Sequence, residues 1–395
     1  MSHKIAIITE YYNSSNYGGN LQAYALTRFL NANGYDTKQL QYMRPSRSFK
    51  DDLRETEGTV NKLSLFTRKV IQKTIKRSEF NRVKNRRGLV VDFGKAMTPH
   101  TDEVYSDSNL IDFYKEHGAY TVDLQNNFDV FITGSDQVWR TTNKKAYFLT
   151  FVPEGKKKIS YAASISKESL SEGDKEFFSM ALKDFDAVSV REKSDVGLLN
   201  GLYKKDIEWV IDPTLLIDRD EWDVICSTRL CKEKYLFCYF LGNEQEPRKL
   251  ARKYAKKHGL KLLMMPYLTG EYPLSDFIKR KDEERLFEAG VQDFLSLIKY
   301  AEAVFTDSFH AAVFSGIFRT QYFVFERAIG VSMNSRIKSL MEIYETPERF
   351  CDTIEKESIE YIESLDDIDY IRELASLESM KKKSKEWLLR NVRAD

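Results

Sequence analysis

Short apolar runs alternate with segments of helical periodicity along almost the whole chain. The runs that predict strands are Lys4–Thr9, Asp129–Thr133, Lys158–Ala163, Ala187–Val190, Trp209–Ile211, Tyr235–Leu241, Lys261–Met265, Ala303–Thr306 and Tyr322–Phe325. Apolar residues recur with helical spacing between these runs, for example in Leu21–Asn31, Glu246–Lys257, Val291–Tyr300 and Asn334–Ile343. Strands separated by helices are typical of parallel sheets built from βαβ units, so the pattern predicts an α/β protein.

Two such sheets fit a chain of 395 residues, because a domain commonly has about 150 residues. We predict the break near Asp212-Pro213-Thr214, where a proline ends one strand and a polar segment follows. The expected organisation is an N-terminal domain over residues 1–212 and a C-terminal domain over residues 213–365. Helices over residues 366–395 are expected to pack back across both domains.

The segment from Lys62 to Arg87 departs from this pattern, since it holds ten Lys or Arg residues and a single acid. It belongs to an expected helical insertion at about residues 44–90. Leu63, Phe66 and Val70 would share one face of that helix. One interpretation is a basic amphipathic helix that makes peripheral contact with an anionic membrane surface. The other is a solvated helix whose apolar stripe packs on the first domain.

Composition narrows the class of protein. The 61 basic and 60 acidic residues nearly cancel, whereas a nucleic-acid-binding protein usually has a strongly basic face, so no nucleic acid is expected as a partner. The four cysteines lack the spacing of a zinc site, which favours a reduced compartment. The apolar run Ile5–Ile8 is too short for a signal peptide or a membrane span. We therefore expect a cytoplasmic protein, with the membrane's inner face as its one peripheral alternative.

Polar residues cluster where predicted strands end, and in parallel sheets ligands bind beyond those carboxyl ends. After the first strand, the stretch from Asn16 to Gln22 opens a helix with two glycines. Its free amides could bind an anion or a sugar hydroxyl, with Asn20 and Gln22 adding side-chain amides. The alternative is an ordinary glycine turn before a helix.

A second cluster, Thr133–Trp139, follows the next clear strand. Gly134 allows a close backbone approach, and the side chains of Asp136 and Gln137 can bind hydroxyl groups. Trp139 offers a flat apolar face of the kind on which sugars stack, although a tryptophan is more often part of a core.

Arg191 comes directly after the strand Ala187–Val190. A guanidinium at the end of a strand can hold a phosphate or carboxylate through two parallel hydrogen bonds. The alternative is an ion pair with a neighbouring acid, Glu192 or Asp195.

Thr306-Asp307-Ser308-Phe309-His310 is the most informative cluster, since it ends a strand and enters a helix of small residues. Ser308 is a natural N-cap residue and could bind an anion together with free amides. His310 would lie in the first turn, and histidine exchanges protons at neutral pH. We therefore predict a catalytic role for His310.

Several familiar chemistries are missing from the sequence. It has no G-x-x-x-x-G-K-S/T phosphate loop, no G-x-G-x-x-G after the first strand and no G-x-S-x-G nucleophile elbow. No D-x-D arrangement of the kind that holds a divalent cation on a nucleotide sugar stands out. We expect no metal.

Taken together, the chain resembles the polysaccharide pyruvyl transferase family. The motifs that carry the resemblance are Asn16–Gln22, Phe128–Trp139, Lys158–Ser166, Ser189–Glu192, Asp212-Pro213-Thr214, Phe294–His310 and Asn334-Ser335-Arg336. Each motif is short, but their order and spacing are specific.

The resemblance implies a glycosyltransferase-B-like fold, in which two Rossmann-like domains face each other across a cleft. The donor would be phosphoenolpyruvate, as a co-substrate with no further cofactor. The acceptor would be a pair of sugar hydroxyls, on a lipid-linked oligosaccharide in several members, and the pathway a bacterial exopolysaccharide or capsule. His310 and Arg191 match positions that are functional in the family. The acceptor would bind the first domain, through Asn20, Gln22, Gly134, Asp136, Gln137 and Trp139.

One position departs from the family. Some members have Arg-Leu-His where this chain has Ser308–His310, so another cation must take the place of that arginine in the donor site. Arg336 is the first candidate and Arg327 the second. Asn334 and Ser335 precede Arg336 and would cap its helix near the donor.

An alternative function remains open at this point. A glycosyltransferase that uses a nucleotide sugar could have the same two domains, and a fold alone does not decide between the two. The second domain lacks an obvious acid that could bind a nucleotide ribose, which argues against this alternative. A non-catalytic carbohydrate-binding protein is a third class, disfavoured by His310 and Arg191.

Overall fold

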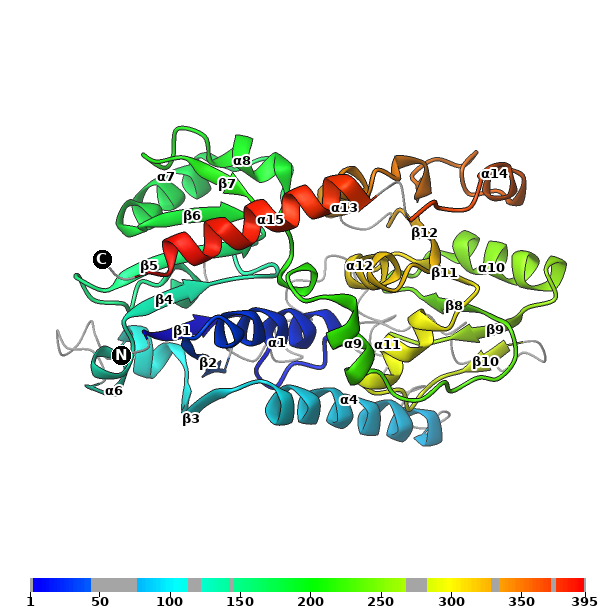
Figure 1. Cartoon of the computed structure of the whole chain (residues 1–395), viewed down its shortest axis with the longest axis horizontal. Coiled ribbons are helices and arrows are strands. Elements are labelled where there is room, and N and C mark those ends of the chain that lie inside the picture. The colour runs from blue at the N-terminus through cyan, green and yellow to red at the C-terminus, as the bar shows by residue number, and fades with distance from the viewer. Residues whose placement is uncertain are drawn as a thin grey trace, which may run out of the picture.

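The computed structural model describes residues 3–43, 77–112, 122–141, 145–267, 283–327, 334–370 and 374–393. Within them, two β-sheets lie side by side with helices packed around each (Figure 1). Every strand pair among these residues is parallel. The α/β class and the two parallel sheets predicted from the sequence are confirmed.

The first sheet has seven strands in the order β3-β2-β1-β4-β5-β6-β7. Its strands are β1 (Lys4–Ile8), β2 (Asp36–Tyr42), β3 (His100–Tyr105), β4 (Val130–Thr133), β5 (Lys157–Ala163), β6 (Ala187–Val190) and β7 (Ile207–Trp209). The helices and helical turns around it are α1 (Tyr17–Ala32), α4 (Arg77–Met97), η1 (Ser108–Asp112), α6 (Val122–Asn127), η2 (Lys145–Phe148), α7 (Glu172–Ala181), η3 (Leu182–Asp184), α8 (Lys193–Leu199), η4 (Pro213–Leu215) and α9 (Arg219–Ile225). The strand order reverses between β1 and β4, which is where Rossmann-like sheets bind ligands.

The second sheet has six strands in the order β10-β9-β8-β11-β12-β13. Its strands are β8 (Tyr235–Tyr239), β9 (Lys261–Met264), β10 (Glu283–Arg285), β11 (Ala303–Thr306), β12 (Gln321–Phe325) and β13 (Phe350–Cys351). The helices and turns are α10 (Gln245–Lys257), α11 (Val291–Lys299), α12 (Phe309–Phe318), α13 (Asn334–Tyr344), η7 (Pro347–Arg349), α14 (Ile359–Ser364) and α15 (Leu374–Asn391). Here the order reverses between β8 and β11. The predicted domain break at residues 212–213 lies between the last strand of the first sheet and the first strand of the second.

The sequence analysis missed four strands, because three of them are rich in polar or charged residues and the fourth is very short. β2 reads Asp-Thr-Lys-Gln-Leu-Gln-Tyr, yet Gln39 is fully buried. Its amide donates to the hydroxyl of Thr27 at 3.1 Å and to the carbonyl of Ala23 at 3.2 Å. A buried polar group is stable when it is hydrogen-bonded, so this strand needs no apolar run. β3 and β10 are sheet edges rich in charged residues, and β13 has two residues.

A continuous apolar core joins the two sheets. Tyr17 of α1 stacks on Phe294 of α11, with ring centroids 4.8 Å apart. Trp222 of α9 meets Phe314 of α12 edge to face at 4.9 Å. All four rings are buried, so the contact between the domains is packed like an interior rather than like a wet surface.

Helix α4 spans the bottom of the molecule and reaches from the first domain to the second (Figure 1). Val90 is buried in the shared core. The fully buried Arg86 donates to the carbonyl of Leu286 at 2.8 Å and to that of Pro266. The basic insertion therefore contacts the second domain as well as the first. Residues 62–76, which carry half of its positive charge, lie outside the described residues, so membrane contact stays a prediction.

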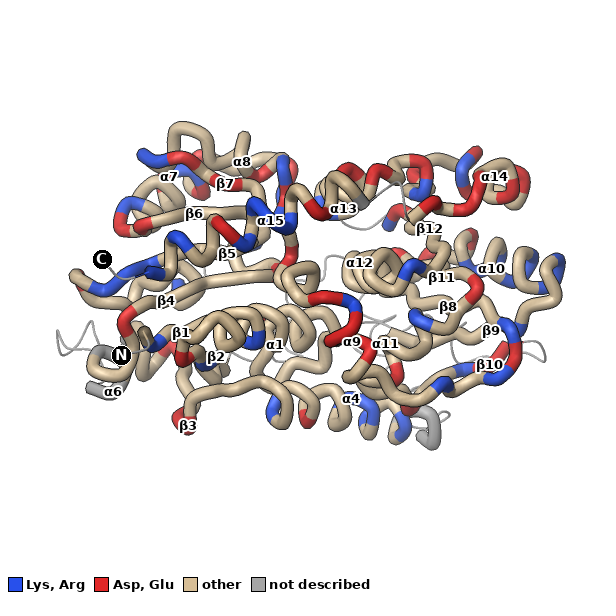
Figure 2. Tube along the Cα trace, viewed as in Figure 1, with Lys and Arg blue, Asp and Glu red and all other residues tan. Residues whose placement is uncertain are grey.

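Helix α15 crosses back over the first sheet on the opposite side of the molecule (Figure 1). The ring of Trp387 packs against that of Tyr161, with ring centroids 6.3 Å apart. The hydroxyl of Ser384 accepts a hydrogen bond from the backbone N–H of Ile211 at 3.1 Å. Basic side chains gather on this helix and on α10, with acidic ones interspersed elsewhere (Figure 2). None of the helices in the described part of the chain is long and apolar enough to cross a membrane.

We expect Arg86→Met to lower the free energy of unfolding by about 2–4 kcal/mol, because two buried carbonyls would lose a charged donor. Urea denaturation measures this. Lys84→Met is the matched control: Lys84 is exposed on the same helix, and its loss should change stability by less than about 0.5 kcal/mol. Equal effects of the two variants would contradict a linking role for Arg86.

Candidate active site

A pocket of about 160 Å³ lies between the two domains, where the carboxyl ends of their strands face each other. Both points of strand-order reversal open onto it. The residues that line it are Asn16, Tyr17, Gly18, Asp136, Gln137, Arg140, Tyr239, Leu241, Tyr267, Phe294, Ser308, Phe309, His310, Arg327 and Arg336. The chain thus brings together six of its thirteen predicted site residues, Asp136, Gln137, Ser308, His310, Arg327 and Arg336, although they are up to 200 positions apart (136 to 336).

Two predicted acceptor residues, Asn20 and Gln22, do not reach this pocket. Both are fully buried. The amide of Asn20 donates to the carbonyls of Ser14 and Asn16, each at 2.9 Å. The carbonyl oxygen of Gln22 accepts from the backbone N–H of Ser135 at 3.1 Å. The prediction that they bind the acceptor is wrong in this structure, because their side chains hold the two loops that border the pocket.

Gly18, in the first turn of α1, touches the second domain. A Cβ atom on this residue would lie 1.9 Å from Nδ1 of His310. Any side chain here would displace the imidazole, so the first domain presses its backbone directly against His310. The Gly-Gly pair in the sequence signalled this close approach, but it did not show what approaches.

The loop after β4 brings Asp136 and Gln137 to the pocket, as predicted. Gly134 has a φ of 113°, and a Cβ there would meet the carbonyl oxygen of Tyr161 at 2.2 Å. Glycine is therefore required for the shape of the loop rather than for contact with a ligand. Gln137 donates to the hydroxyl of Ser166 at 2.9 Å, which fixes its amide at the pocket wall.

The prediction that Trp139 stacks on the acceptor sugar is wrong. It is fully buried, and its ring stacks on Phe148 with a centroid distance of 5.6 Å. Its indole N–H donates to the carbonyl of Tyr147 at 3.0 Å. One face and the polar edge are used inside the first domain and no part of the residue is exposed, so Trp139 offers no platform for a sugar. The core alternative, rather than the stacking one, is correct.

Arg191 lies directly behind the pocket with 3% of its surface exposed. Its Nε donates to Glu192 at 3.0 Å and its Nη1 to Asp212 at 2.9 Å, while Nη2 is 3.6 Å from Asp136. The guanidinium also lies 4.5 Å from the ring centre of Phe309. Burial opposes the charge, but the three carboxylates outweigh it and raise the pKa of Arg191. A bidentate grip on a ligand, as the sequence suggested, is not available in this arrangement.

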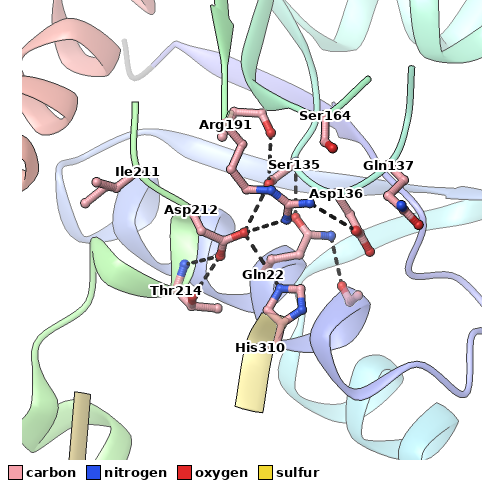
Figure 3. A network of polar contacts seen from close by, with 12 residues as sticks. Gln22, Ser135, Asp136, Gln137, Ser164, Arg191, Ile211, Asp212, Thr214 and His310 are labelled. Carbon is pink, nitrogen blue, oxygen red and sulfur yellow. Dashed lines mark hydrogen bonds and ion pairs between the residues drawn. The ribbon is translucent and has the colours of Figure 1, made fainter. Parts of the chain in front are cut away.

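Asp212 was not predicted as a site residue, yet it stands at the centre of the polar network in Figure 3. Its Oδ1 accepts from the N–H and hydroxyl of Thr214 at 3.0 and 2.7 Å. Its Oδ2 accepts from Arg191 and, at 3.3 Å, from Ser135, and lies 3.7 Å from Nε2 of His310. Burial disfavours the carboxylate, but His310 and Arg191 hold its pKa well below the usual range. The Asp-Pro-Thr motif was the signal that could have revealed it.

His310 enters the pocket from the first turn of α12. Ser308 caps this helix, since its hydroxyl accepts from the backbone N–H of Ala311 at 3.5 Å. Both Ser308 and His310 line the pocket, as predicted. The neighbouring Asp307 points away, and accepts from the N–H of Leu241 at 2.6 Å and that of Gly242 at 2.7 Å.

Arg336 and Arg327 supply positive charge at the pocket. Burial, followed by the nearby charges of Arg191 and Arg327, lowers the pKa of Arg336 to about 9. Arg327 is partly engaged, because its Nη2 donates to the carbonyl of Asp307 at 3.2 Å. Asn334 donates to Glu326 instead of facing the pocket, and Ser335 does not line it either.

These positions give the pocket a definite chemical character. Three arginines and a histidine face it against one acid, Asp136. The N-termini of α1 and α12 add partial positive charge at the same place. The arrangement suits a small, multiply charged anion that lies beside a group able to exchange protons.

Known structures resemble the whole chain. A putative UDP-N-acetylglucosamine 2-epimerase from Listeria monocytogenes aligns with a TM-score of 0.55 at 11% identity, covering 98% of this chain and 95% of that one. S. aureus MnaA in its structure with UDP aligns with a TM-score of 0.55 at 10% identity, covering 99% of this chain and 96% of that one. The UDP-GlcNAc 2-epimerase from Methanocaldococcus jannaschii aligns with a TM-score of 0.51 at 12% identity, covering 99% of both chains. Such identities establish the fold alone, which is of glycosyltransferase-B type.

No curated protein matches the sequence. A family does: the sequence profile described as "Polysaccharide pyruvyl transferase" matches residues 16–328. This stretch covers β4, β8 and β11 at the two points of strand-order reversal and almost every residue that lines the pocket, from Asn16 to Arg327. The chain therefore belongs to the polysaccharide pyruvyl transferase family.

Proposed function

We propose that the pocket binds phosphoenolpyruvate and transfers its pyruvyl group to two hydroxyls of a sugar as a ketal. The observation that carries this proposal is the cluster of Arg140, Arg327 and Arg336 around a pocket that His310 also lines, because holding like charges close together has a cost. A phosphate and a carboxylate next to these cations would remove that cost. His310 lines the same small pocket and is the group that could protonate the donor.

The reaction needs one proton donor and two proton acceptors. The imidazolium of His310 gives its proton to the methylene carbon of phosphoenolpyruvate, which becomes the methyl group. A sugar hydroxyl attacks C2 and returns its proton to His310. The bond between C2 and the phosphate oxygen then breaks, phosphate leaves, and the second hydroxyl closes the ketal as its proton passes to phosphate. Arg336 and Arg327 would stabilise the negative charge of the leaving phosphate.

The acceptor sugar would lie towards Gln137, Arg140 and Tyr267 at the pocket wall. Asp136 can accept a hydrogen bond from an attacking hydroxyl. Tyr267 is half-buried and presents an aromatic ring there, so it takes the stacking role first assigned to Trp139.

Mass spectrometry of candidate acceptors tests the proposal. Free and lipid-linked oligosaccharides would be incubated with phosphoenolpyruvate, and a pyruvylated product with equimolar phosphate is expected. A thermal-shift comparison of phosphoenolpyruvate with nucleotide sugars tests the alternative donor class. Stabilisation by nucleotide sugars alone would overturn the assignment of the donor.

We expect His310→Gln to lower kcat for pyruvyl transfer by about 10²–10⁴-fold, the usual contribution of a general acid or base. Binding of phosphoenolpyruvate, measured by calorimetry, should change little, because glutamine keeps a polar side chain in the pocket. The control is His258→Gln: His258 ends α10, contacts Glu363 at 3.0 Å and should leave kcat unchanged. Turnover at the wild-type rate in the His310 variant would contradict its role.

We expect Arg336→Met to keep or raise the Tm of the ligand-free protein, because it removes a buried charge near two other cations. The rise in Tm that phosphoenolpyruvate causes in the wild type should disappear. Arg336→Lys should also weaken donor binding, since it lacks the planar fork. Differential scanning fluorimetry measures both effects.

A second buried arginine provides the control for this experiment. Arg349 lies under Phe323 in the second domain and donates to the carbonyl of Asp366. Arg349→Met should lower Tm with and without ligand, while the shift caused by phosphoenolpyruvate remains. If Arg336→Met keeps that shift and Arg327→Lys loses it, the donor lies nearer Arg327 than proposed.

A further inference from the structure

Asp212 contacts a charged side chain of its own domain, Arg191, and a histidine of the other domain, His310. It follows β7 at the end of the first sheet's last strand, and Arg191, which it binds, follows β6 of the same sheet. His310 comes from α12 of the second domain, and its Nε2 lies 3.7 Å from the same carboxylate oxygen. One side chain thus contacts the buried cation of one domain and the proton-transfer group of the other.

The carboxylate of Asp212 is not available to a substrate. It is 2% exposed and does not line the pocket. Thr214 occupies Oδ1 with two hydrogen bonds, and Ser135 and Arg191 occupy Oδ2. Any effect on the reaction must therefore pass through Arg191 or His310.

His310 depends on this neighbour for the orientation of its ring. Its Nε2 is buried and makes no hydrogen bond within the described part of the chain, and its other edge is pressed against Gly18. The charged groups at the pocket and its rear wall, within the described residues, are Asp212, Arg191, Glu192, Asp136, Arg140, Arg327 and Arg336. Among the described residues, Asp212 is the carboxylate found within 4 Å of the ring nitrogens, at 3.7 Å, whereas Asp136 faces Arg191 at 3.6 Å.

We propose that Asp212 is a positioning residue: it orients the imidazole of His310 and keeps Arg191 behind the pocket. The inference rests on the proposed function, in which His310 must first be an imidazolium in order to protonate the donor.

Asp212→Asn tests the proposal, because it keeps the shape and removes the charge. We expect kcat for pyruvyl transfer to fall on the order of 10²-fold, the lower range for loss of a general acid. KM for phosphoenolpyruvate should change little, since Arg327 and Arg336 remain. A loss that falls on KM alone would overturn the proposal.

Asp195→Asn is the matched control. Asp195 is fully buried near Arg191, and its Oδ2 accepts from the N–H of Ile165 at 2.9 Å. Burial and Glu192 raise its pKa, and asparagine keeps its shape and an oxygen that can accept from Ile165. We expect wild-type kcat. An equal loss of kcat in both variants would show a merely structural role.

A second readout does not depend on turnover. The chain has five histidines, and His310→Gln identifies the ¹⁵N ring signals of His310 by their loss. In Asp212→Asn, the ring signals of His310 should move from their wild-type positions, because the ring loses the carboxylate 3.7 Å from its Nε2, and in Asp195→Asn they should be unchanged. If the wild type makes no pyruvylated product, the proposed function fails, while these spectra still decide the role of Asp212. Unchanged spectra in Asp212→Asn would overturn it.

Thr214→Val keeps the inference testable if Asp212→Asn does not fold. It removes one of the hydrogen bonds that fix the carboxylate, with nearly the same volume, and leaves the charge in place. We expect a smaller fall in kcat with the same unchanged KM. Wild-type kcat together with an unchanged ring spectrum would count against the proposal.

Discussion

The apolar contact between the two sheets is the constraint on which the rest of the structure depends. Tyr17 and Phe294 stack across it, and Trp222 and Phe314 meet within it. Because these rings are buried, the carboxyl ends of both sheets are held face to face. The pocket exists only because of this contact, since one half of its wall follows β1 and β4 and the other follows β8 and β11.

Within this frame, the chain concentrates charge where water is excluded. Arg191, Asp212, Glu192 and Asp136 form a buried network whose members are largely paired with one another. Such networks contribute little net stability, because desolvation offsets the attraction between the charges. Arg336, with its lowered pKa, adds a charge that the fold tolerates rather than gains from. This is the pattern expected of a site in which stability is given up for binding.

The sequence was sufficient for the α/β class, the two parallel sheets and the loops that reach the pocket, because strand ends in parallel sheets meet at one edge. The sequence could not show which side chains of these loops face the pocket and which turn into the core. Asn20, Gln22 and Trp139 follow the right strands, but hydrogen bonds to neighbouring loops and a stacked ring turn them inward. β2 escaped detection because a buried glutamine, satisfied by Thr27 and Ala23, takes the place of an apolar residue. Asp212 was visible only as part of a motif, since its partners lie 21 and 98 positions away (191 and 310).

Helix α4 has a consequence for how ligands reach the pocket. It runs along both halves of the molecule, while α15 crosses the first sheet and contacts α13 (Figure 1). Swinging the halves apart would pull Arg86 away from the carbonyls of Leu286 and Pro266 and would expose the stacked rings beside it. Opening the pocket by separating the two halves would therefore cost buried hydrogen bonds to a charged donor.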